Sequence, residues 1–205
     1  MLTFFYNWTS PYSRKVRIAL AELEIPHEGK IEDPPNPTPE FQAVNPNWRI
    51  PAIVDGKVRL FESNLILEYL LKTYPGQSKE TPPFAKGFVR PNHRWDDATT
   101  LVAIETMLNS GINLLQMQRD EIRPDQSAYL RREDERIQRD LDWLEKRADP
   151  EGFAPGEFSI LDLNLICALE WGEFREIIAW RDRPNLSAIV ARYQERESVR
   201  ATKPA

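Results

Sequence analysis

Proline at position 51 constrains the fold of this chain more than any other residue, because it opens a run of β-forming residues. The run Ala52–Val54 is connected by an Asp55-Gly56 turn to a second run, Val58–Phe61. Proline cannot donate to a β ladder, so Pro51 fits best if the bond before it is cis, a feature that folded chains retain deliberately. We expect the backbone N–H and C=O of Ile50 to face outward, where a peptide-like ligand can pair with them.

Glu62 and Ser63 follow this hairpin and begin the next expected helix. The N-terminus of a helix is a ready site for a carboxylate, because its first N–H groups have no partner within the helix. Together with Ile50, these residues predict a surface that holds a small peptide.

The first part of the chain alternates between strand and helix patterns. Leu2–Tyr6 reads as a buried strand, and Ser10-Pro11 supplies an N-cap and a first-turn proline. The further expected elements are a helix over Pro11–Glu24, a strand over Ile25–Ile31, a proline-rich loop over 34–39, a helical turn over Glu40–Val44, the hairpin, and a helix over Ser63–Tyr74. This β-α-β then β-β-α order predicts a small α/β domain.

A polar, proline-containing linker, Gln77–Pro83, follows a helix stop at Pro75-Gly76. We therefore expect one domain over residues 1–77 and a second over 84–205. All strong patterns of the second domain have helical spacing: Phe88–Gln118 with a restart at Pro91, Ala128–Arg147, Phe158–Trp171, and a final helix marked by Leu186, Ile189, Val190 and Tyr193.

Ser159 and Asp162 form a capping-box pattern at the start of the apolar Phe158–Trp171 segment. The serine caps the helix and the acid three residues later reaches back to the cap. This pair is expected to be structural, with no part in chemistry.

Composition excludes several classes of function. The net charge is −5 and the longest basic run is the Arg131-Arg132 pair, so a nucleic-acid partner is not expected. The chain contains no apolar stretch of 18 residues, so a membrane span is not expected. Cys167 is the single cysteine and reads as a buried small side chain, while His27 and His93 are too isolated to predict a metal site. A reducing cytoplasm is the expected location.

The whole chain resembles the cytosolic glutathione transferase superfamily, and in particular bacterial transferase-like proteins with Thr-Ser-Pro-Phe/Tyr at the first helix. The resemblance rests on motifs in a given order, which are the segment from Ser10 to Arg17, Asn45-Pro with Ile50-Pro51, Glu62-Ser63, Ser159 with Asp162, and Asp182-Arg-Pro-Asn-Leu186. It implies a thioredoxin-like N-terminal domain, an all-helical C-terminal domain, a homodimer, and glutathione as co-substrate with no metal.

The resemblance also implies roles for individual residues. Ile50 pairs with the cysteinyl part of glutathione, Glu62 and Ser63 hold its γ-glutamyl end, and Arg49 keeps a positive charge that the family often has as lysine. Trp48 departs from the family, which often has a small residue there, so the loop is expected to run differently and to contribute an aromatic wall.

Ser10 is the first candidate for the residue that contacts the sulfur of glutathione. A thiol attacks as thiolate, and a helix N-terminus or a donated hydrogen bond lowers its pKa. Tyr6 is the rival, at the position of the catalytic tyrosine in tyrosine-type transferases, although an aromatic residue in a strand is commonly part of the core. Thr9 and Ser13 are lesser candidates.

The expected function is addition of the glutathione thiolate to a small hydrophobic electrophile. The lack of a cysteine near Ser10 argues against thiol exchange. Two alternatives stay open, since fold does not decide function: a binding or regulatory protein that kept the fold without turnover, and a glutathione-dependent isomerase or dehalogenase.

Overall fold

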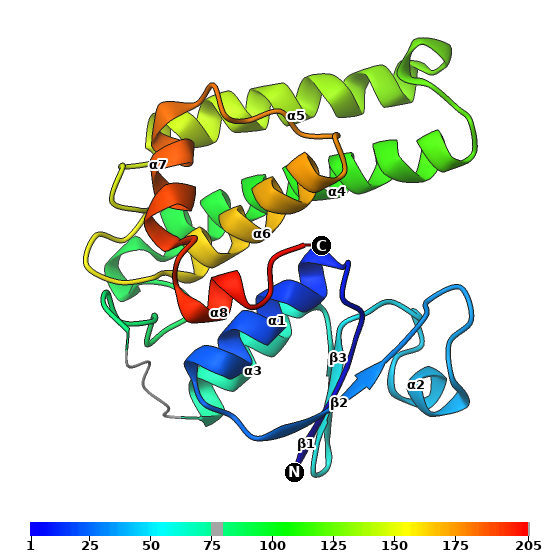
Figure 1. Ribbon diagram of the computed structural model, residues 1–205, viewed down its shortest axis with the longest axis vertical. Coiled ribbons are helices and arrows are strands. Elements are labelled where there is room, and N and C mark those ends of the chain that lie inside the picture. The colour runs from blue at the N-terminus through cyan, green and yellow to red at the C-terminus, as the bar shows by residue number, and fades with distance from the viewer. Residues whose placement is uncertain (75–79, 205) are drawn as a thin grey trace. The chain divides into compact units, whose positions relative to one another are not determined.

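The computed structural model describes residues 1–74 and 80–204, which form two compact units (Figure 1). The N-terminal unit comprises Met1–Phe88 together with the residues from Arg196 onward, and the helical unit comprises Val89–Glu195. The expected helix stop at Pro75-Gly76 and the start of the expected linker Gln77–Pro83 lie outside the described residues. Residues 196–204 were expected to belong to the second domain, but they pack with the N-terminal unit.

The N-terminal unit is built on a four-stranded sheet in the order β2-β1-β3-β4. The strands are β1 (Leu2–Tyr6), β2 (His27–Ile31), β3 (Ala52–Asp55) and β4 (Val58–Phe61). β1 pairs parallel with β2 and antiparallel with β3, and β3 pairs antiparallel with β4. This is the expected β-α-β then β-β-α arrangement, and the Ile50–Pro51 bond is cis as the sequence predicts.

Helices cover both faces of this sheet (Figure 1). Helices α1 (Pro11–Glu22) and α3 (Ser63–Thr73) pack together on one face, and α2 (Pro39–Val44) lies on the other. Phe5 of β1 packs on the α2 side with Phe41, Val44 and Ala52. Successive strand residues point to opposite faces, so the neighbouring Phe4, also fully buried, points to the α1 side.

A short helix near the chain end, α8 (Glu197–Arg200), packs against α1. Arg14 of α1 donates from Nη2 to the carbonyl of Val199, 3.2 Å away, and from Nε to Oγ1 of Thr202 at 3.3 Å. The sequence pattern did not predict this helix, because four residues are too few to show a helical period.

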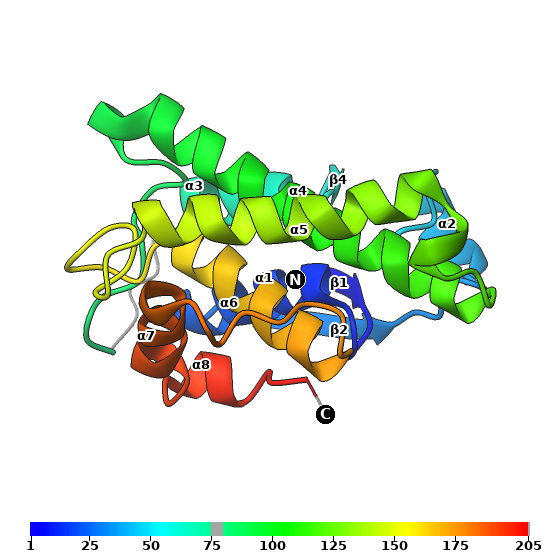
Figure 2. The same ribbon diagram turned by 90° about the horizontal axis from the view of Figure 1, so that it is seen from above.

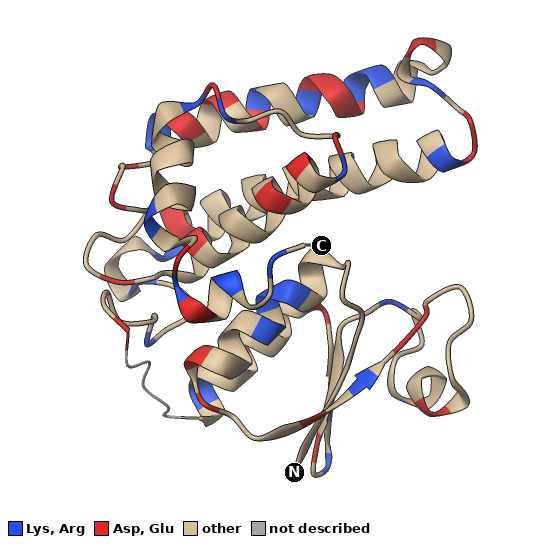
Figure 3. Ribbon diagram, viewed as in Figure 1, with Lys and Arg blue, Asp and Glu red and all other residues tan. Residues whose placement is uncertain are grey.

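The helical unit contains 3₁₀ turns η1 (Pro91–His93) and η2 (Pro124–Gln126) and the helices α4 (Arg94–Arg119), α5 (Ala128–Arg147), α6 (Ile160–Phe174) and α7 (Pro184–Tyr193). α4 and α5 run side by side (Figure 2). Figure 3 shows the many charges on α5, whose apolar face is buried as its spacing predicts. α6 is buried along almost its whole length. Within the described residues, no helix combines the length and apolar character needed to cross a bilayer.

Among the helices that begin or end away from their expected bounds, two do so for clear local reasons. The first ends at Glu22 because Glu24 takes a left-handed conformation, with φ of 51°, while Ile25 N–H donates to the carbonyl of Leu20. α4 begins at Arg94, since Pro91 occupies the preceding 3₁₀ turn.

Candidate functional site

The residues singled out from the sequence gather at one end of the N-terminal sheet. In the β1–β3 ladder Phe5 lies opposite Ala52, and in the β3–β4 ladder Ala52 lies opposite Phe61. The three chain segments that continue from these positions therefore emerge together. They are the turn leading from Tyr6 to Ser10, the Ile50-Pro51 approach to β3, and Glu62-Ser63 after β4.

Ser10 is the N-cap of α1. Its Oγ accepts a hydrogen bond from Ser13 N–H at 3.1 Å, and Pro11 fills the first helical turn. A hydroxyl has one proton besides its lone pairs, so capping leaves the Ser10 proton able to donate elsewhere. The side chain is half-buried at the positive end of the helix dipole.

Tyr6 has a different environment, on the sheet itself. Its ring stacks on Phe4, with centroids 4.9 Å apart, and meets Trp8 edge-on at 5.2 Å. Gly29 on β2 makes room for it, since a Cβ there would lie 3.0 Å from Tyr6 Cε1. Arg17 of α1 lies over both Trp8 and Tyr6, at 4.2 and 5.9 Å from the ring centroids. Tyr6 is thus part of an aromatic layer.

The two lesser candidates support the turn before α1. Thr9 is exposed, and both its N–H and its hydroxyl donate to Oδ1 of Asn7, each at 2.8 Å. Ser13 is fully buried, and its Oγ accepts from Asn7 N–H at 3.4 Å. Both side chains therefore hold the turn that carries Ser10.

Ile50 presents an unpaired stretch of backbone. Among the residues that the structure describes, none hydrogen-bonds to its N–H or C=O. Its side chain packs against the apolar cluster beneath α2. An anchored side chain with unpaired backbone groups is the arrangement that lets an extended ligand add to a sheet edge.

Asn45 holds the loop that leads to Ile50. Its buried side chain donates from Nδ2 to the Arg49 carbonyl at 2.5 Å and accepts at Oδ1 from Asn47 N–H at 2.9 Å. Trp48 N–H donates to the Asn45 carbonyl at 3.2 Å. This role of Asn45 was not predicted from the sequence, although asparagine before a turn is a known signal of such side-chain to backbone bonds.

Glu62 and Ser63 differ in exposure and in backbone. Glu62 is exposed, with φ of 73° and ψ of 115°, outside the regions that side chains commonly occupy. Its side chain makes no capping bond to α3. Ser63 is buried at the first helical position. The exposed carboxylate and the N–H groups of α3 thus lie next to each other.

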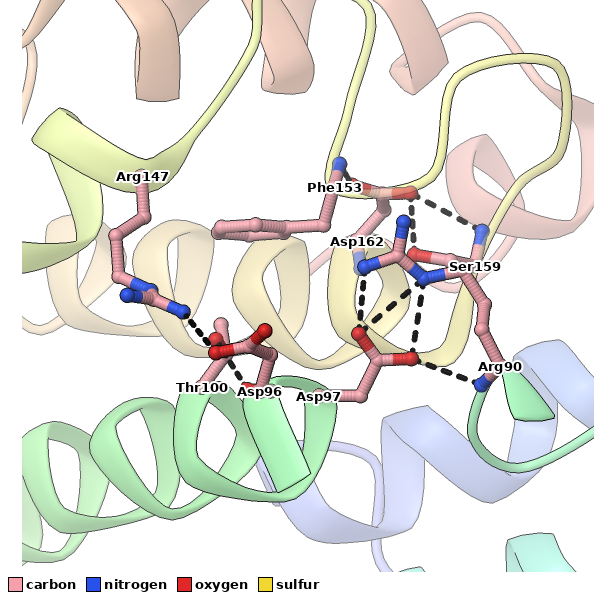
Figure 4. Close-up of polar contacts among 8 residues, drawn as sticks. All are labelled: Arg90, Asp96, Asp97, Thr100, Arg147, Phe153, Ser159 and Asp162. Atoms are coloured by element: carbon pink, nitrogen blue, oxygen red, sulfur yellow. Dashed lines mark hydrogen bonds and ion pairs between the residues drawn. The ribbon is translucent and has the colours of Figure 1, made fainter. Parts of the chain in front are cut away.

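The capping box lies in the helical unit and is formed as predicted. Ser159 Oγ accepts from Asp162 N–H at 3.1 Å, while the Asp162 carboxylate accepts from the N–H groups of Ser159 and Phe153 at 3.0 and 2.9 Å (Figure 4). Complete burial raises the pKa of Asp162 to about 6, although these hydrogen bonds oppose the rise. Both of its oxygens accept hydrogen bonds from neighbouring residues of the fold.

Neighbouring ion pairs fix the start of α4 in the same unit. Arg90 holds the buried Asp97 carboxylate through Nη2 at 2.6 Å, through Nε, and through its own N–H at 2.8 Å. Arg147 of α5 donates to Asp96 at 3.0 Å (Figure 4). Both carboxylates are paired, as expected of structural groups.

A groove of about 570 Å³ opens where α4 ends in the helical unit. Its apolar part is formed by Leu114, Ile122, Pro124 and Ile177, and its polar part by Gln118, Glu121, Arg123, Asp125, Asp134 and Glu176. This groove cannot be recognised from the sequence pattern, because its residues come from three separate segments. Cys167 is fully buried on α6, and within the described chain no three His, Cys, Asp or Glu side chains are grouped to hold a metal.

Two family descriptions match the chain. "Glutathione S-transferase, N-terminal domain" matches residues 9–73, and "Glutathione S-transferase, C-terminal domain" matches residues 127–192.

Curated relatives match over shorter stretches. Glutathione S-transferase U1 of Arabidopsis thaliana is 38% identical over 89 residues, which is 40% of this chain and 38% of that protein. A stringent starvation protein A homolog of Pasteurella multocida (strain Pm70) is 35% identical over 75 residues, 37% of this chain and 35% of that protein. The matched part thus spans little more than a third of these relatives.

Solved structures match over the whole length. A glutathione transferase family member from Pseudomonas fluorescens Pf-5 with bound glutathione has a TM-score of 0.77 and 25% identity, covering 100% of both chains. A glutathione S-transferase from Methylobacillus flagellatus KT with glutathione bound has a TM-score of 0.80 and 22% identity, again over 100% of both chains. The N-terminal sheet unit and the helical unit together form a glutathione transferase-like fold.

Proposed function

The chain belongs to the glutathione transferase superfamily, and on this premise we propose that it binds glutathione and adds its thiolate to a small hydrophobic electrophile. The observation that carries the proposal is the unpaired backbone of Ile50, next to Glu62-Ser63 and at the same end of the sheet as Ser10. Each part of a γ-glutamyl peptide with a thiol has a chemically suitable partner there.

Backbone pairing and charge would hold the peptide. The N–H and C=O of Ile50 pair with the cysteinyl residue, as in strand addition. Ser63, through its hydroxyl and N–H at the start of α3, binds the α-carboxylate of the γ-glutamyl residue, and the exposed Glu62 carboxylate binds its ammonium group. Arg49 is exposed beside Ile50 and provides a positive charge for the other carboxylate.

Ser10 is the proposed thiol contact. A free thiol has a pKa near 8.5 and is mostly protonated at neutral pH. A hydrogen bond from the Ser10 hydroxyl, together with the positive end of α1, stabilises the thiolate and lowers that pKa. Tyr6 stays the second candidate, but its packing on Phe4 and Trp8 already accounts for its ring.

The groove of the helical unit is a separate candidate site for a small ligand. Its floor of Leu114, Ile122 and Ile177 favours an apolar ligand. Its carboxylates outnumber the one guanidinium, Arg123, which contacts Asp125 with Nε and Oδ1 3.3 Å apart. A neutral or cationic ligand is therefore favoured in this groove over an anionic one. A detoxifying role in the cytoplasm is part of the proposed transferase function.

A homodimer is the proposed assembly. Trp95 and Val102 lie on α4, seven residues apart and so on one face, with exposed fractions of 77% and 63%. Large apolar side chains exposed together favour a protein interface. Light scattering at micromolar concentration tests this, since a monomer mass of 23.9 kDa contradicts it.

A binding or regulatory role without turnover is the alternative, favoured by the likeness to a relative named as a stringent starvation protein rather than a transferase. A glutathione-dependent isomerase or dehalogenase would use the same thiolate. Calorimetry with glutathione, followed by assays with a panel of electrophiles, tests the proposal. Binding with turnover of an electrophile supports it, binding without turnover of any supports the alternative, and no heat at millimolar glutathione rejects the transferase proposal.

A further inference from the structure

Trp48 combines two properties that rarely occur in one residue. Its φ is 51°, in the left-handed region that favours glycine, and its side chain is 51% exposed. A bulky side chain in that region costs free energy, and a buried core does not repay the cost here. An outlier of this kind, two residues before Ile50, is reason to look for a role in binding.

The loop fixes Trp48 in this conformation. Asn45 accepts from Trp48 N–H at its carbonyl and, through its side chain, bonds to the residues on either side, Asn47 and Arg49. The indole is thus carried on a segment that is held at three points. An exposed ring on such a segment is preorganised to contact a ligand at Ile50.

The direction of the bound peptide follows from the register of the sheet. Ala52 lies opposite Phe61 at the end of the ladder, so continuing the antiparallel register puts Glu62 nearest Pro51, and Ile50 lies between Pro51 and Trp48 in the chain. If the γ-glutamyl end lies at Glu62-Ser63 and the cysteinyl residue at Ile50, the ligand runs antiparallel to the loop. Its third residue then extends alongside Arg49 toward Trp48.

We propose that Trp48 is a specificity-determining residue, whose indole packs against the C-terminal glycyl residue of glutathione and selects the tripeptide over γ-glutamylcysteine. This inference rests on the proposed function, because it takes glutathione as the ligand. The ring supplies apolar contact to the glycyl methylene, while Arg49 beside it supplies charge for the terminal carboxylate.

Calorimetry of the full chain with two probes, glutathione and γ-glutamylcysteine, tests the inference. Trp48→Asn and Trp48→Gly both tolerate positive φ, so each variant is expected to fold at least as stably as the parent. We expect each to bind glutathione about five- to tenfold more weakly, as loss of one apolar contact predicts, and γ-glutamylcysteine within about twofold of the parent. Trp48→Tyr, which restores an aromatic face, should recover most of the glutathione affinity.

Other outcomes overturn the inference in distinguishable ways. Parent protein that binds neither probe removes the proposed function and this inference with it. If the parent and Trp48→Asn bind glutathione equally tightly, the proposed function stands and Trp48 has no role in specificity. Equal weakening toward both probes assigns the effect to the loop as a whole, and the glycyl contact is then wrong.

Discussion

Arg196 and Glu22, 174 residues apart in the chain, form a buried ion pair within the N-terminal unit. Arg196 Nε and Nη2 lie 2.6 and 2.7 Å from the two carboxylate oxygens of Glu22, and both side chains are at most 3% exposed. Ser198 also donates to Glu22, and Arg196 Nη1 donates to the Pro82 carbonyl at 2.7 Å. The end of the chain is therefore fastened to both α1 and the segment before the helical unit.

Glu22→Gln should destabilise the protein by about 3–5 kcal/mol, because it leaves the Arg196 charge buried without a counter-charge. Urea unfolding measures this. The control is Glu135→Gln, in an exposed pair with Arg139, which should change the free energy of unfolding by less than about 0.5 kcal/mol. Equal changes in the free energy of unfolding for the two substitutions would contradict a stabilising role of the ion pair between Glu22 and Arg196.

Ser10→Ala should raise the pKa of the bound glutathione thiol by about one to two units, since it removes a bond of about 1.5–3 kcal/mol to the thiolate. Turnover near neutral pH should fall tenfold or more by the same arithmetic. The ultraviolet absorbance of the thiolate gives the titration. Loss of the α1 cap also costs about 1 kcal/mol, so Ser127→Ala, which removes the cap of α5, is the matched control. A less stable Ser10→Ala protein with an unchanged thiol pKa would make Ser10 only a cap, and Tyr6→Phe would be the next variant.

Glu62→Gln and Ser63→Ala should each weaken glutathione binding, by about 1.5–3 kcal/mol for a charge-assisted contact, with little change in fold. Calorimetry measures the affinity. Glu68→Gln on the same helix removes a half-buried carboxylate that pairs with Lys72 and should leave binding unchanged. Parent-like binding by both site variants would mean that the γ-glutamyl end lies elsewhere.

Asn45→Ala should lower both stability and glutathione affinity. It removes two hydrogen bonds from a buried side chain, at about 1–3 kcal/mol, and frees the loop that carries Ile50. Asn47→Ala is the control, because Asn47 is exposed and contributes its backbone N–H whatever its side chain. If Asn45→Ala loses stability but binds glutathione like the parent, the loop needs no such support to present Ile50.

Asp162 should make the protein less stable as pH rises from about 4 to 6. Burial raises its pKa in the folded protein to about 6, above the value near 3.9 of an unfolded chain. The folded state thus binds the proton more tightly, and that stabilisation is present below pH 4 and lost as pH rises through 6. The stability advantage of the parent over Asp162→Asn should shrink by about 2–3 kcal/mol over this range. An advantage that grows with pH would show that the hydrogen bonds to the carboxylate outweigh its burial.

Local patterns were enough to predict much of this fold. The hairpin around Asp55-Gly56, the cis bond before Pro51 and the capping box of Ser159 and Asp162 each depend on residues a few positions apart, and each is present. The gathering of Ile50 and Glu62-Ser63 follows from the same hairpin, because one ladder sets their register.

Features that depend on distant residues escaped prediction. Arg196 in the sequence gives no sign that it pairs with Glu22, so α8 and the attachment of the chain end were missed. The groove draws on three separate segments for the same reason. For Trp48, the sequence showed a bulky residue where the family often has a small one, but it did not show how the loop responds. The loop keeps the backbone conformation suited to glycine, and the hydrogen bonds of Asn45 hold it there.

The buried ion pair between Arg196 and Glu22 also sets an order of events during synthesis. At 5–20 residues per second, Glu22 is added to the growing chain roughly 9 to 35 seconds before Arg196. Through that interval the carboxylate of Glu22, at the end of α1, lacks Arg196 as its counter-charge. The entire helical unit is translated before Arg196, so the N-terminal unit is completed after the helical unit.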